Sequence, residues 1–443
     1  MHSVASAPAM NVARFNDPTF SEQVRKLIGS SSLFDPVIEE RTRAIVEAVR
    51  TRGDAALIEF TQKFDGATLT PERFEVSKAE LLNASLQAED KLRTAVAMAR
   101  RNIERFSRKS LRKSWSIANA QGARVGEKFD PFQRVGVYIP GGTAPLVSTA
   151  LMTVLLAKVA GCPEIVVCTP CNRNGEINAA LLYAARTAGA TRIFRLGGSQ
   201  AIAAMAYGTA TVPRVQKIFG PGNAYVVAAK RLLFGHVATD LLPGPSEVLV
   251  LADDSAKAPF VAADLLAQAE HGSGHERVWL ITSSAKLLGT VEKEIETQLP
   301  TLRRRELIER ALNANGWLVL VKTIDDGIKL VNQIAPEHCE IMARKGKEVA
   351  KQIVSAGAIF IGDNSPTVLG DYVAGPSHTL PTGGAGASFA GLTVDQFQRR
   401  TSVVEYSRAS LKKSLAALET FAAVEGLDAH GRSAEIRRKA GKR

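Results

Sequence analysis

Between residues 134 and 362 the chain alternates short apolar runs with longer stretches in which apolar residues recur every three or four positions. The short runs are rich in Val, Ile, Leu and Phe, which is typical of strands buried on both faces of a parallel sheet. The longer stretches have the period of amphipathic helices. This alternation predicts an α/β protein whose parallel sheets are covered by helices. The predicted strands are 134–140, 164–170, 192–198, 215–222, 246–253, 277–283, 316–322, 339–343 and 357–362.

The pattern of strand and helix runs through the chain twice, which predicts two α/β units of similar length. Helices are expected over 34–114 before the first unit and over 408–439 at the end. Residues 363–392 are rich in glycine and have no period. Such a long stretch without regular structure inside a compact protein is usually functional.

Composition places the chain among ordinary globular proteins, with 45% hydrophobic and 23% charged residues among 443. No apolar run reaches the roughly 18 residues that a membrane helix needs, and residues 1–20 lack the pattern of a secretory signal. We therefore expect a cytoplasmic protein without a membrane partner. The four cysteines are too few for a disulfide scaffold.

The net charge of +12 raises the question of nucleic acid binding. The basic residues are spread along the chain, and aromatic residues make up only 6% of it. We therefore expect no nucleic acid partner, and a basic surface that assists an anionic cofactor is the better interpretation.

Glycine-rich turns follow three of the predicted strands, at 139–145, 196–202 and 219–225. Glycine lets the backbone approach a phosphate, and the next helix offers free N–H groups. None of the turns has the G-x-G-x-x-G spacing of the usual dinucleotide fingerprint. The turns are compatible either with a nucleotide site or with ordinary strand-to-helix connections.

The stretch "PEHCE" (336–340) places Glu337 and His338 side by side at a predicted strand start. A carboxylate beside an imidazole suits proton abstraction and water activation. The neighbouring Cys339 could instead be a nucleophile, although an apolar strand follows it. "CTPC" (168–171) has redox spacing, but its first cysteine falls within a predicted strand, which favours a core role.

Other polar residues could hold a metal ion. Gln268 and His271 are three residues apart at the end of a predicted helix, so they share a face. Asp371 lies in the glycine-rich loop and His430 near the C-terminus. Nitrogen and oxygen donors without thiolates suit zinc or manganese in a functional site. Each of these four residues could instead be an ordinary polar residue of the core or the surface.

Taken together, these stretches resemble the histidinol dehydrogenase family from about residue 13 to residue 438. The resemblance rests on many motifs in the family's order rather than on one. They are "VGVYIPGG", "LGGSQAIAA", "KIFGPGNAYV", "LPGPSEVLVLAD", "LLAQAEHG", "APEHCEI", "GDYVAGPSHTLPTGG" and "EGLDAH".

The resemblance implies oxidation of L-histidinol to L-histidine through histidinaldehyde with two NAD, the final step of histidine biosynthesis. It implies one zinc per subunit, which manganese could replace. The implied zinc ligands are Gln268, His271, Asp371 and His430. His430 would come from the partner subunit of a homodimer with shared active sites.

The resemblance also implies a role for each remaining candidate. His338 would accept the hydroxyl proton, and Glu337 would activate water on the aldehyde. The zinc ligands and His338 would also contact the substrate, together with Ser246, His378 and Glu425. NAD would contact Tyr138, Gln200 and Asn223.

The implied fold has two Rossmann-like parallel-sheet domains with small helical N- and C-terminal segments. The expected parts are an arm over 1–33, a first α/β domain from 34–137 and 249–392, a second, NAD-contacting domain over 138–248, and a helical dimerisation segment over 393–443. Three alternatives stay open: a zinc hydrolase, a nucleic-acid-binding protein, and a paralogous dehydrogenase for another alcohol.

Overall fold

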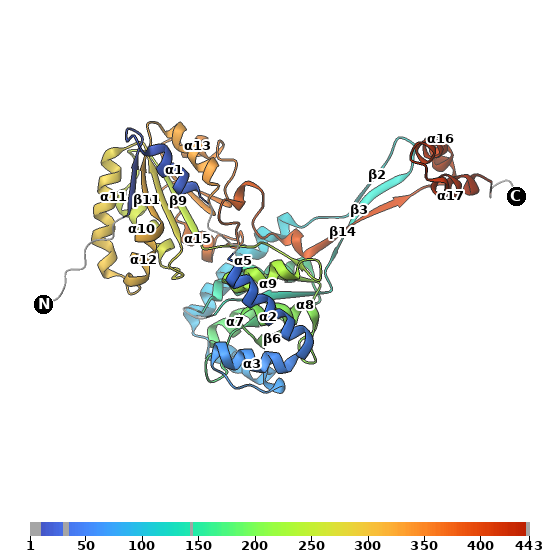
Figure 1. Ribbon diagram of the computed structural model, residues 1–443, viewed down its shortest axis with the longest axis horizontal. Coiled ribbons are helices and arrows are strands. Elements are labelled where there is room, and N and C mark those ends of the chain that lie inside the picture. The colour runs from blue at the N-terminus through green and yellow to red at the C-terminus, as the bar shows by residue number, and fades with distance from the viewer. Residues whose placement is uncertain (1–9, 30–34, 142–144, 440–443) are drawn as a thin grey trace. The chain divides into compact units, whose positions relative to one another are not determined.

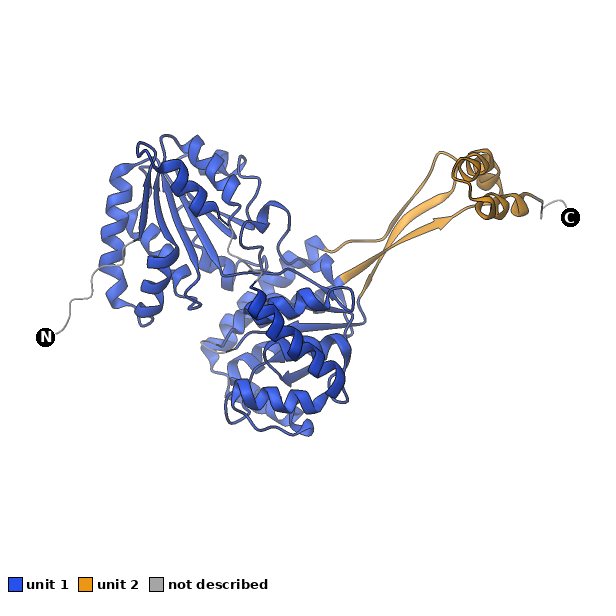
Figure 2. Cartoon of the chain, in the orientation of Figure 1, with its two compact units in different colours: residues 1–110, 132–397 blue, residues 111–131, 398–443 orange. Residues whose placement is uncertain are grey.

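The computed structural model describes residues 10–29, 35–141 and 145–439. Its contacts divide the chain into two compact units (Figure 2). The first unit combines residues 1–110 with 132–397, and the second combines 111–131 with 398–443. We describe each unit by itself.

A six-stranded sheet, in which every neighbouring pair is parallel, forms one half of the first unit (Figure 1). Its strands in spatial order are β1 (Asn11–Arg14), β11 (Gly316–Leu320), β10 (Arg277–Thr282), β9 (Glu247–Ala252), β12 (His338–Met342) and β13 (Ala358–Ile361). Successive residues of β9 enter different apolar clusters: Val248 and Val250 join one, Leu249 and Leu251 the other. The sheet is thus buried on both faces, as its continuous apolar runs predicted.

Helices supply the other side of each of these clusters. One cluster receives α10 (Ala258–Ala269), α11 (Ala285–Gln298) and α12 (Arg305–Asn315). The other receives α1 (Phe20–Ile28), α13 (Ile324–Ile334) and α14 (Gly346–Ala350).

A second parallel sheet, of five strands, forms the rest of the first unit. Its strands in spatial order are β6 (Arg192–Arg195), β5 (Glu164–Thr169), β4 (Arg134–Tyr138), β7 (Lys217–Phe219) and β8 (Ala238–Thr239). One apolar cluster joins this sheet to α2 (Pro36–Arg52), α3 (Asp54–Asp65), α8 (Gly198–Tyr207) and α9 (Ala224–Leu233). The remaining helices here are α4 (Lys78–Gln87), α5 (Asp90–Ser110), α6 (Val147–Ala160) and α7 (Ala179–Ala188), of which α6 packs on β4 and β5.

All nine strands predicted from the apolar runs are present, and the α/β fold class is confirmed. Two segments of the chain belong to other parts of the fold than expected. The helices between 36 and 110 contact the helices of the five-stranded sheet, not those of the six-stranded one with which they were expected. The described part of the N-terminal arm is not separate, because β1 pairs with β11 and α1 packs beside it. Amphipathic periods show which face of a helix is buried but not which sheet covers it.

The second unit contains a three-stranded antiparallel sheet that the sequence analysis missed. Its strands are β2 (Trp115–Ala118), β3 (Arg124–Pro131) and β14 (Gln398–Glu405). The expected helical segment over 393–443 therefore begins with a 3-10 turn (Val394–Phe397) and a strand. The helices α16 (Arg408–Val424) and α17 (Asp428–Lys439) follow as predicted.

Within the described ranges, no helix is both long enough and apolar enough to cross a membrane.

Candidate active site

The sequence-predicted acid and base lie at the amino-terminal edge of the six-stranded sheet. His338 is the first residue of β12, and Glu337 immediately precedes it. Ser246 likewise immediately precedes a strand, the neighbouring β9. Because α10 runs back across the sheet, its carboxyl end carries Gln268 to this edge, and His271 follows one turn later. Ligand sites of open α/β sheets usually lie at the opposite edge, but the sequence had already placed this pair at the start of a predicted strand.

Glu247, the first residue of β9, holds both catalytic candidates through its backbone. Its N–H donates to Oε2 of Glu337 over 2.7 Å, and its carbonyl oxygen lies 2.8 Å from Nδ1 of His338. In return, its side chain accepts from the Glu337 N–H over 3.3 Å. Two strands paired in parallel register thus fix the carboxylate and the imidazole together.

These contacts determine which nitrogen of His338 can act as a base. A carbonyl oxygen only accepts, so Nδ1 must carry the proton and Nε2 keeps its lone pair. Burial lowers the pKa of His338, as do the charges of His271 and His378, while Asp371 raises it. The imidazole is therefore neutral at pH 7, which is the form a proton acceptor needs.

Glu337 is buried with a carboxylate next to it and no cation paired with it among the residues that the structure describes. Burial raises the pKa of Glu337 well above its usual value, and the charges of Glu247 and Asp371 raise it further. A carboxyl group whose pKa is moved toward neutrality is a better proton acceptor than an exposed one.

Four of the expected metal and substrate residues lie around this pair: Gln268, His271, Asp371 and His378. Oδ1 of Asp371 lies 4.0 Å from Nε2 of His338 and 3.9 Å from Nδ1 of His378. Gln268 Nε2 lies 3.3 Å from His271 Nδ1. Burial lowers the pKa of His378, and the His271 charge lowers it further, so these imidazoles share one neighbourhood.

His378 is fixed between two segments far apart in the sequence. Its Nδ1 lies 3.1 Å from the carbonyl oxygen of Asp371, and its Nε2 lies 3.2 Å from the hydroxyl of Thr149 in α6. Asp371 itself belongs to a short helix, α15 (Thr367–Tyr372), inside the glycine-rich loop. The loop expected to be functional therefore carries two of the clustered residues.

The residue types at this edge fit zinc or manganese, although one subunit supplies an incomplete set. Across the described ranges no three His, Cys, Asp or Glu side chains are placed to hold a metal ion. His271 and Asp371 are two such groups, and the buried amide of Gln268 is a third donor of a type these metals accept. Glu425 and His430 are exposed in the second unit, between α16 and the first turn of α17.

The cysteines are poor nucleophiles. Cys339 points away from the site into the apolar cluster of α13 and α14, and burial raises its pKa to about 12. Cys168 is buried in β5 and Cys171 is a free thiol, with a pKa raised to about 11 by burial. The alternatives of a Cys339 nucleophile and a CTPC redox centre therefore lack the thiolate they need.

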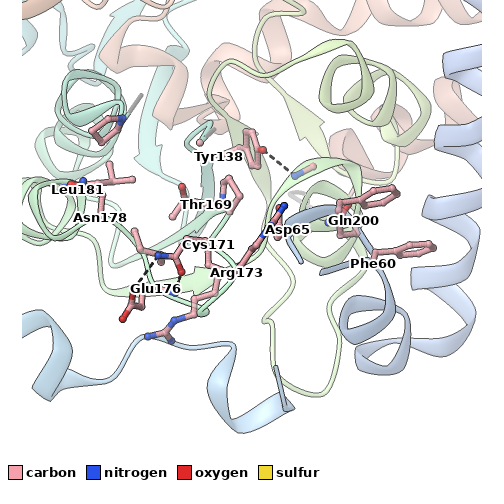
Figure 3. Close-up of a pocket in the computed structure, with 18 of the residues that line it drawn as sticks. Phe60, Asp65, Tyr138, Thr169, Cys171, Arg173, Glu176, Asn178, Leu181 and Gln200 are labelled. Carbon is pink, nitrogen blue, oxygen red and sulfur yellow. Dashed lines mark hydrogen bonds between the residues drawn. The ribbon is translucent and has the colours of Figure 1, made fainter. Parts of the chain in front are cut away.

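A cavity of about 1840 Å³ opens at the carboxyl ends of the strands of the five-stranded sheet (Figure 3). Its walls include Tyr138, Gln200 and Asn223, the residues expected to contact NAD. Tyr138 ends β4, Gln200 lies in the first turn of α8, and Asn223 caps α9. The glycine turns thus meet at one edge, except that residues 142–144 of the first turn lie outside the described residues.

The turn after β7 requires glycine for a specific reason. Gly220 has φ +110°, and a Cβ there would lie 2.1 Å from the Tyr138 carbonyl oxygen. The fully buried Lys230 and Asp240 form an ion pair beside it. Lys230 donates to the Gly220 carbonyl oxygen over 3.0 Å, and Asp240 accepts from the Gly220 N–H over 2.7 Å.

Known proteins resemble this chain over nearly its whole length. The family model described as "Histidinol dehydrogenase" matches residues 31–438. A curated histidinol dehydrogenase of Synechococcus sp. is 46% identical over 401 residues, which is 90% of this chain and 92% of the relative. The chain belongs to the histidinol dehydrogenase family. One from Bacteroides fragilis is 45% identical over 93% of this chain and 95% of its own.

A solved structure extends the match to three dimensions. The crystal structure of histidinol dehydrogenase from Elizabethkingia anophelis has a TM-score of 0.92 at 36% identity, and the alignment covers 98% of this chain and 99% of that one. Family membership decides against the zinc hydrolase that would use similar residue types.

Sequence reasoning missed two residues that this member of the histidinol dehydrogenase family places at the site. Glu247 and Arg277 begin neighbouring strands in register, and Arg277 Nη1 lies 3.2 Å from Glu247 Oε1. A usable signal existed, because each is a charged residue that opens an otherwise apolar strand. Charges of opposite sign at such positions predict a buried pair at one sheet edge.

Replacing Glu337 by glutamine should stabilise the protein at high pH. The pKa of Glu337 is higher in the folded protein than the value of roughly 4.3 in an unfolded chain. The protonated carboxyl group therefore contributes stability that is fully present below the unfolded-state pKa and is lost as the pH rises through the folded-state pKa. Glutamine stays neutral and can still accept from the Glu247 N–H. We expect Glu337→Gln to raise the free energy of unfolding by about 0.5–2 kcal/mol at pH 8, with a smaller gain at pH 5.

Urea unfolding at the two pH values would measure this difference. The matched control is Glu348→Gln, an exposed position in α14, which should change stability by less than about 0.5 kcal/mol. A Glu337→Gln protein that is less stable than wild type at pH 8 would contradict the unfavourable burial of this charge.

Proposed function

We propose that this chain is the NAD-dependent histidinol dehydrogenase that oxidises L-histidinol to L-histidine, the final step of histidine biosynthesis. The observation that carries the proposal is the buried pair at the start of β12. His338 has a free Nε2, and Glu337 next to it is a carboxylate without a paired cation in the described part of the chain. One proton acceptor is thus available for each of two successive oxidations at the same place.

The first oxidation converts the primary alcohol to an aldehyde. Nε2 of His338 accepts the hydroxyl proton as the carbon loses a hydride to NAD. The Glu247 carbonyl oxygen holds the ring and stabilises the proton on Nδ1, which increases the basicity of Nε2. Histidinaldehyde stays in the site, which avoids losing a reactive intermediate to solvent.

The second oxidation needs a water molecule and a second NAD. Glu337 takes a proton from water as its oxygen bonds to the aldehyde carbon. The resulting hydrate anion loses a hydride from carbon to the second NAD and becomes the carboxylic acid, which releases its remaining proton to solvent as the carboxylate of L-histidine. The Glu247 N–H on Oε2 fixes the Glu337 carboxylate while it accepts this proton.

Zinc, one per subunit, would be held by Gln268, His271 and Asp371 together with His430 of the partner subunit; manganese suits the same donors. When bound, the metal would grip the substrate's imidazole and amine and so fix the reacting carbon. We place Ser246, His378 and Glu425 in contact with the substrate as well. Tyr138, Gln200 and Asn223 would contact NAD.

We propose a homodimer with shared active sites, and the second unit supports this. Its two helices and three strands bury few apolar side chains, and many large ones are exposed. These are Trp115, Ile117, Val403, Val404, Tyr406, Leu418, Phe421, Val424, Leu427 and Ile436. An apolar surface of this extent is typical of an interface between subunits.

The experiment that tests the function is the amount of NADH formed per L-histidinol consumed, measured by absorbance before and after chelation. We expect two NADH per substrate, loss of activity on chelation, and recovery with added zinc. NADH from a different alcohol alone would make this chain a paralogous dehydrogenase. No NADH from any alcohol would overturn the proposal.

Separate mutations should separate the two oxidations. Glu337→Gln should slow the oxidation of histidinaldehyde about 10²-fold or more, because it removes the water-activating base, and should affect the alcohol step much less. His338→Asn should mainly slow the alcohol step. Stopped-flow measurement of each step with its own substrate would test this, with Cys339→Ser as an active control. Equal losses in both steps for Glu337→Gln would contradict its assigned role.

A mixture of two inactive variants should recover activity if the sites are shared. Gln268→Ala and His430→Ala remove proposed ligands from different chains of the same site. After subunit exchange, about a quarter of the sites should be intact, because a heterodimer has one site with both defects and one with neither. Each variant alone is the control. A mixture no more active than its components, despite proven exchange, would place His430 outside a shared site.

A further inference from the structure

The floor of the 1840 Å³ cavity contains buried polar atoms without partners. Across the described chain, ten buried side-chain nitrogen or oxygen atoms lack a hydrogen-bond partner. Four of these ten belong to three residues of the cavity wall: Asp65 Oδ2, Thr169 Oγ1, and Oε1 and Nε2 of Gln200. Leaving such atoms unpaired is costly, so their concentration in one cavity indicates a ligand that pairs with them.

These side chains surround one strand-to-helix turn, Gly197–Gly198. A Cβ on Gly197 would lie 3.4 Å from Asp65 Oδ1 and 2.6 Å from Cβ of Pro170, the neighbour of Thr169. A Cβ on Gly198 would lie 2.8 Å from Gln200 Oε1. Figure 3 shows Asp65 and Gln200 near each other in the cavity wall, with Tyr138 and Thr169 close by.

The Gly198 N–H and the Arg195 guanidinium nearby are already engaged with other groups. The Gly198 N–H, at the start of α8, donates to the Tyr138 hydroxyl over 3.0 Å. The guanidinium of Arg195 donates to the carbonyl oxygens of Gly175, Arg73 and Glu75 and pairs with Glu80. Among the described residues Asp65 has no ion pair. Its pKa is raised to about 6 by burial, so it is an anion at pH 8.

An anionic carboxylate with a hydroxyl and an amide beside it repels phosphate and attracts hydroxyl donors. The cations that could meet phosphates line the same cavity and include Arg41, Arg52, Lys63 and Arg173. A dinucleotide has both kinds of group, since its pyrophosphate is anionic and each ribose carries a pair of neighbouring hydroxyls. In dinucleotide-binding folds generally, a carboxylate accepts from such a pair.

We propose that Asp65, together with Thr169 and Gln200, forms the subsite that binds the neighbouring hydroxyls of one ribose of NAD. This inference rests on the proposed function for the identity of the dinucleotide. Asp65 is the last residue of α3, outside the five-stranded sheet itself. The adenosine ribose and the nicotinamide ribose offer the same chemistry, so the test separates them.

The test compares the wild-type protein with Asp65→Asn, which keeps the size of the side chain but removes its charge. Calorimetry measures binding of ADP, 2′-deoxy-ADP and nicotinamide mononucleotide, and kinetics measure KM and kcat. We expect KM for NAD to rise about 10-fold or more, since hydrogen bonds to a charged acceptor are lost. The kcat at saturating NAD and the KM for histidinol should change less than about threefold. Asp325→Asn, an exposed position in α13, is the matched control.

The affinities for these three nucleotides show which ribose of NAD the subsite binds. If the adenosine ribose is bound, wild type prefers ADP over 2′-deoxy-ADP, and Asp65→Asn loses both the preference and most of the affinity for ADP. NADP should then also compete better with NAD in the variant, because its 2′-phosphate no longer meets a carboxylate. If the nicotinamide ribose is bound, only the affinity for nicotinamide mononucleotide falls.

Unchanged affinity for both nucleotides and an unchanged KM for NAD would overturn the subsite. If Asp65→Asn does not fold, Thr169→Val replaces it, with the same expectation of weaker nucleotide binding at constant kcat. Binding is measured without turnover, so a protein that oxidises no alcohol but still shows these differences would refute the proposed function alone.

Discussion

The arrangement of the site depends on the parallel pairing of β9 with β12. This register places Glu247 beside Glu337 and His338 at the amino-terminal edge of the six-stranded sheet. The backbone of Glu247 then orients both, donating to the carboxylate and accepting from the imidazole. A shift of one residue would turn every side chain of β12 to the other face. The apolar clusters on both faces of the sheet oppose such a shift, so core packing fixes the chemistry.

The two sheets contribute through opposite edges. Nucleotide-type turns lie at the carboxyl ends of the five-stranded sheet, where the expected NAD residues line one cavity. The expected acid and base and three of the four expected metal ligands, Gln268, His271 and Asp371, lie at the amino ends of the six-stranded sheet. The glycine-rich loop contacts α6, which packs on the five-stranded sheet, because His378 bonds to Thr149 and Ser377 donates to the Met152 carbonyl oxygen. One loop therefore has contacts with both the cofactor-side helix α6 and the catalytic edge.

The sequence predicted the parts of this arrangement that depend on local spacing. Continuous apolar runs identified the parallel strands, and Gln268 and His271 meet because they are three residues apart at a helix end. Contacts between distant segments were not predictable. The Glu247–Glu337 bonds span 90 residues and the Thr149–His378 bond spans 229, so both depend on the tertiary fold. The strands β2, β3 and β14 were missed because their side chains are exposed or only half-buried, so no buried face gives them the continuous apolar run that marked the other strands.

Burial of two neighbouring carboxylates is costly unless one is paired with a cation or one takes up a proton. Arg277, in register with Glu247, pairs with it, and the Gly383 N–H donates to the same carboxylate over 3.0 Å. Burial raises the pKa of Glu247 as well, but the charge of Arg277 and these hydrogen bonds oppose the rise. Glu337 accepts from a backbone N–H but has no such cation in the described structure, so desolvation and the charge of Glu247 raise its pKa well above the usual value. In the proposed mechanism Glu247 is therefore a structural anchor and Glu337 the proton acceptor, although the two lie side by side at the start of parallel strands. In that mechanism, the pairing of Arg277 with Glu247 leaves Glu337 as the carboxylate that can take up a proton.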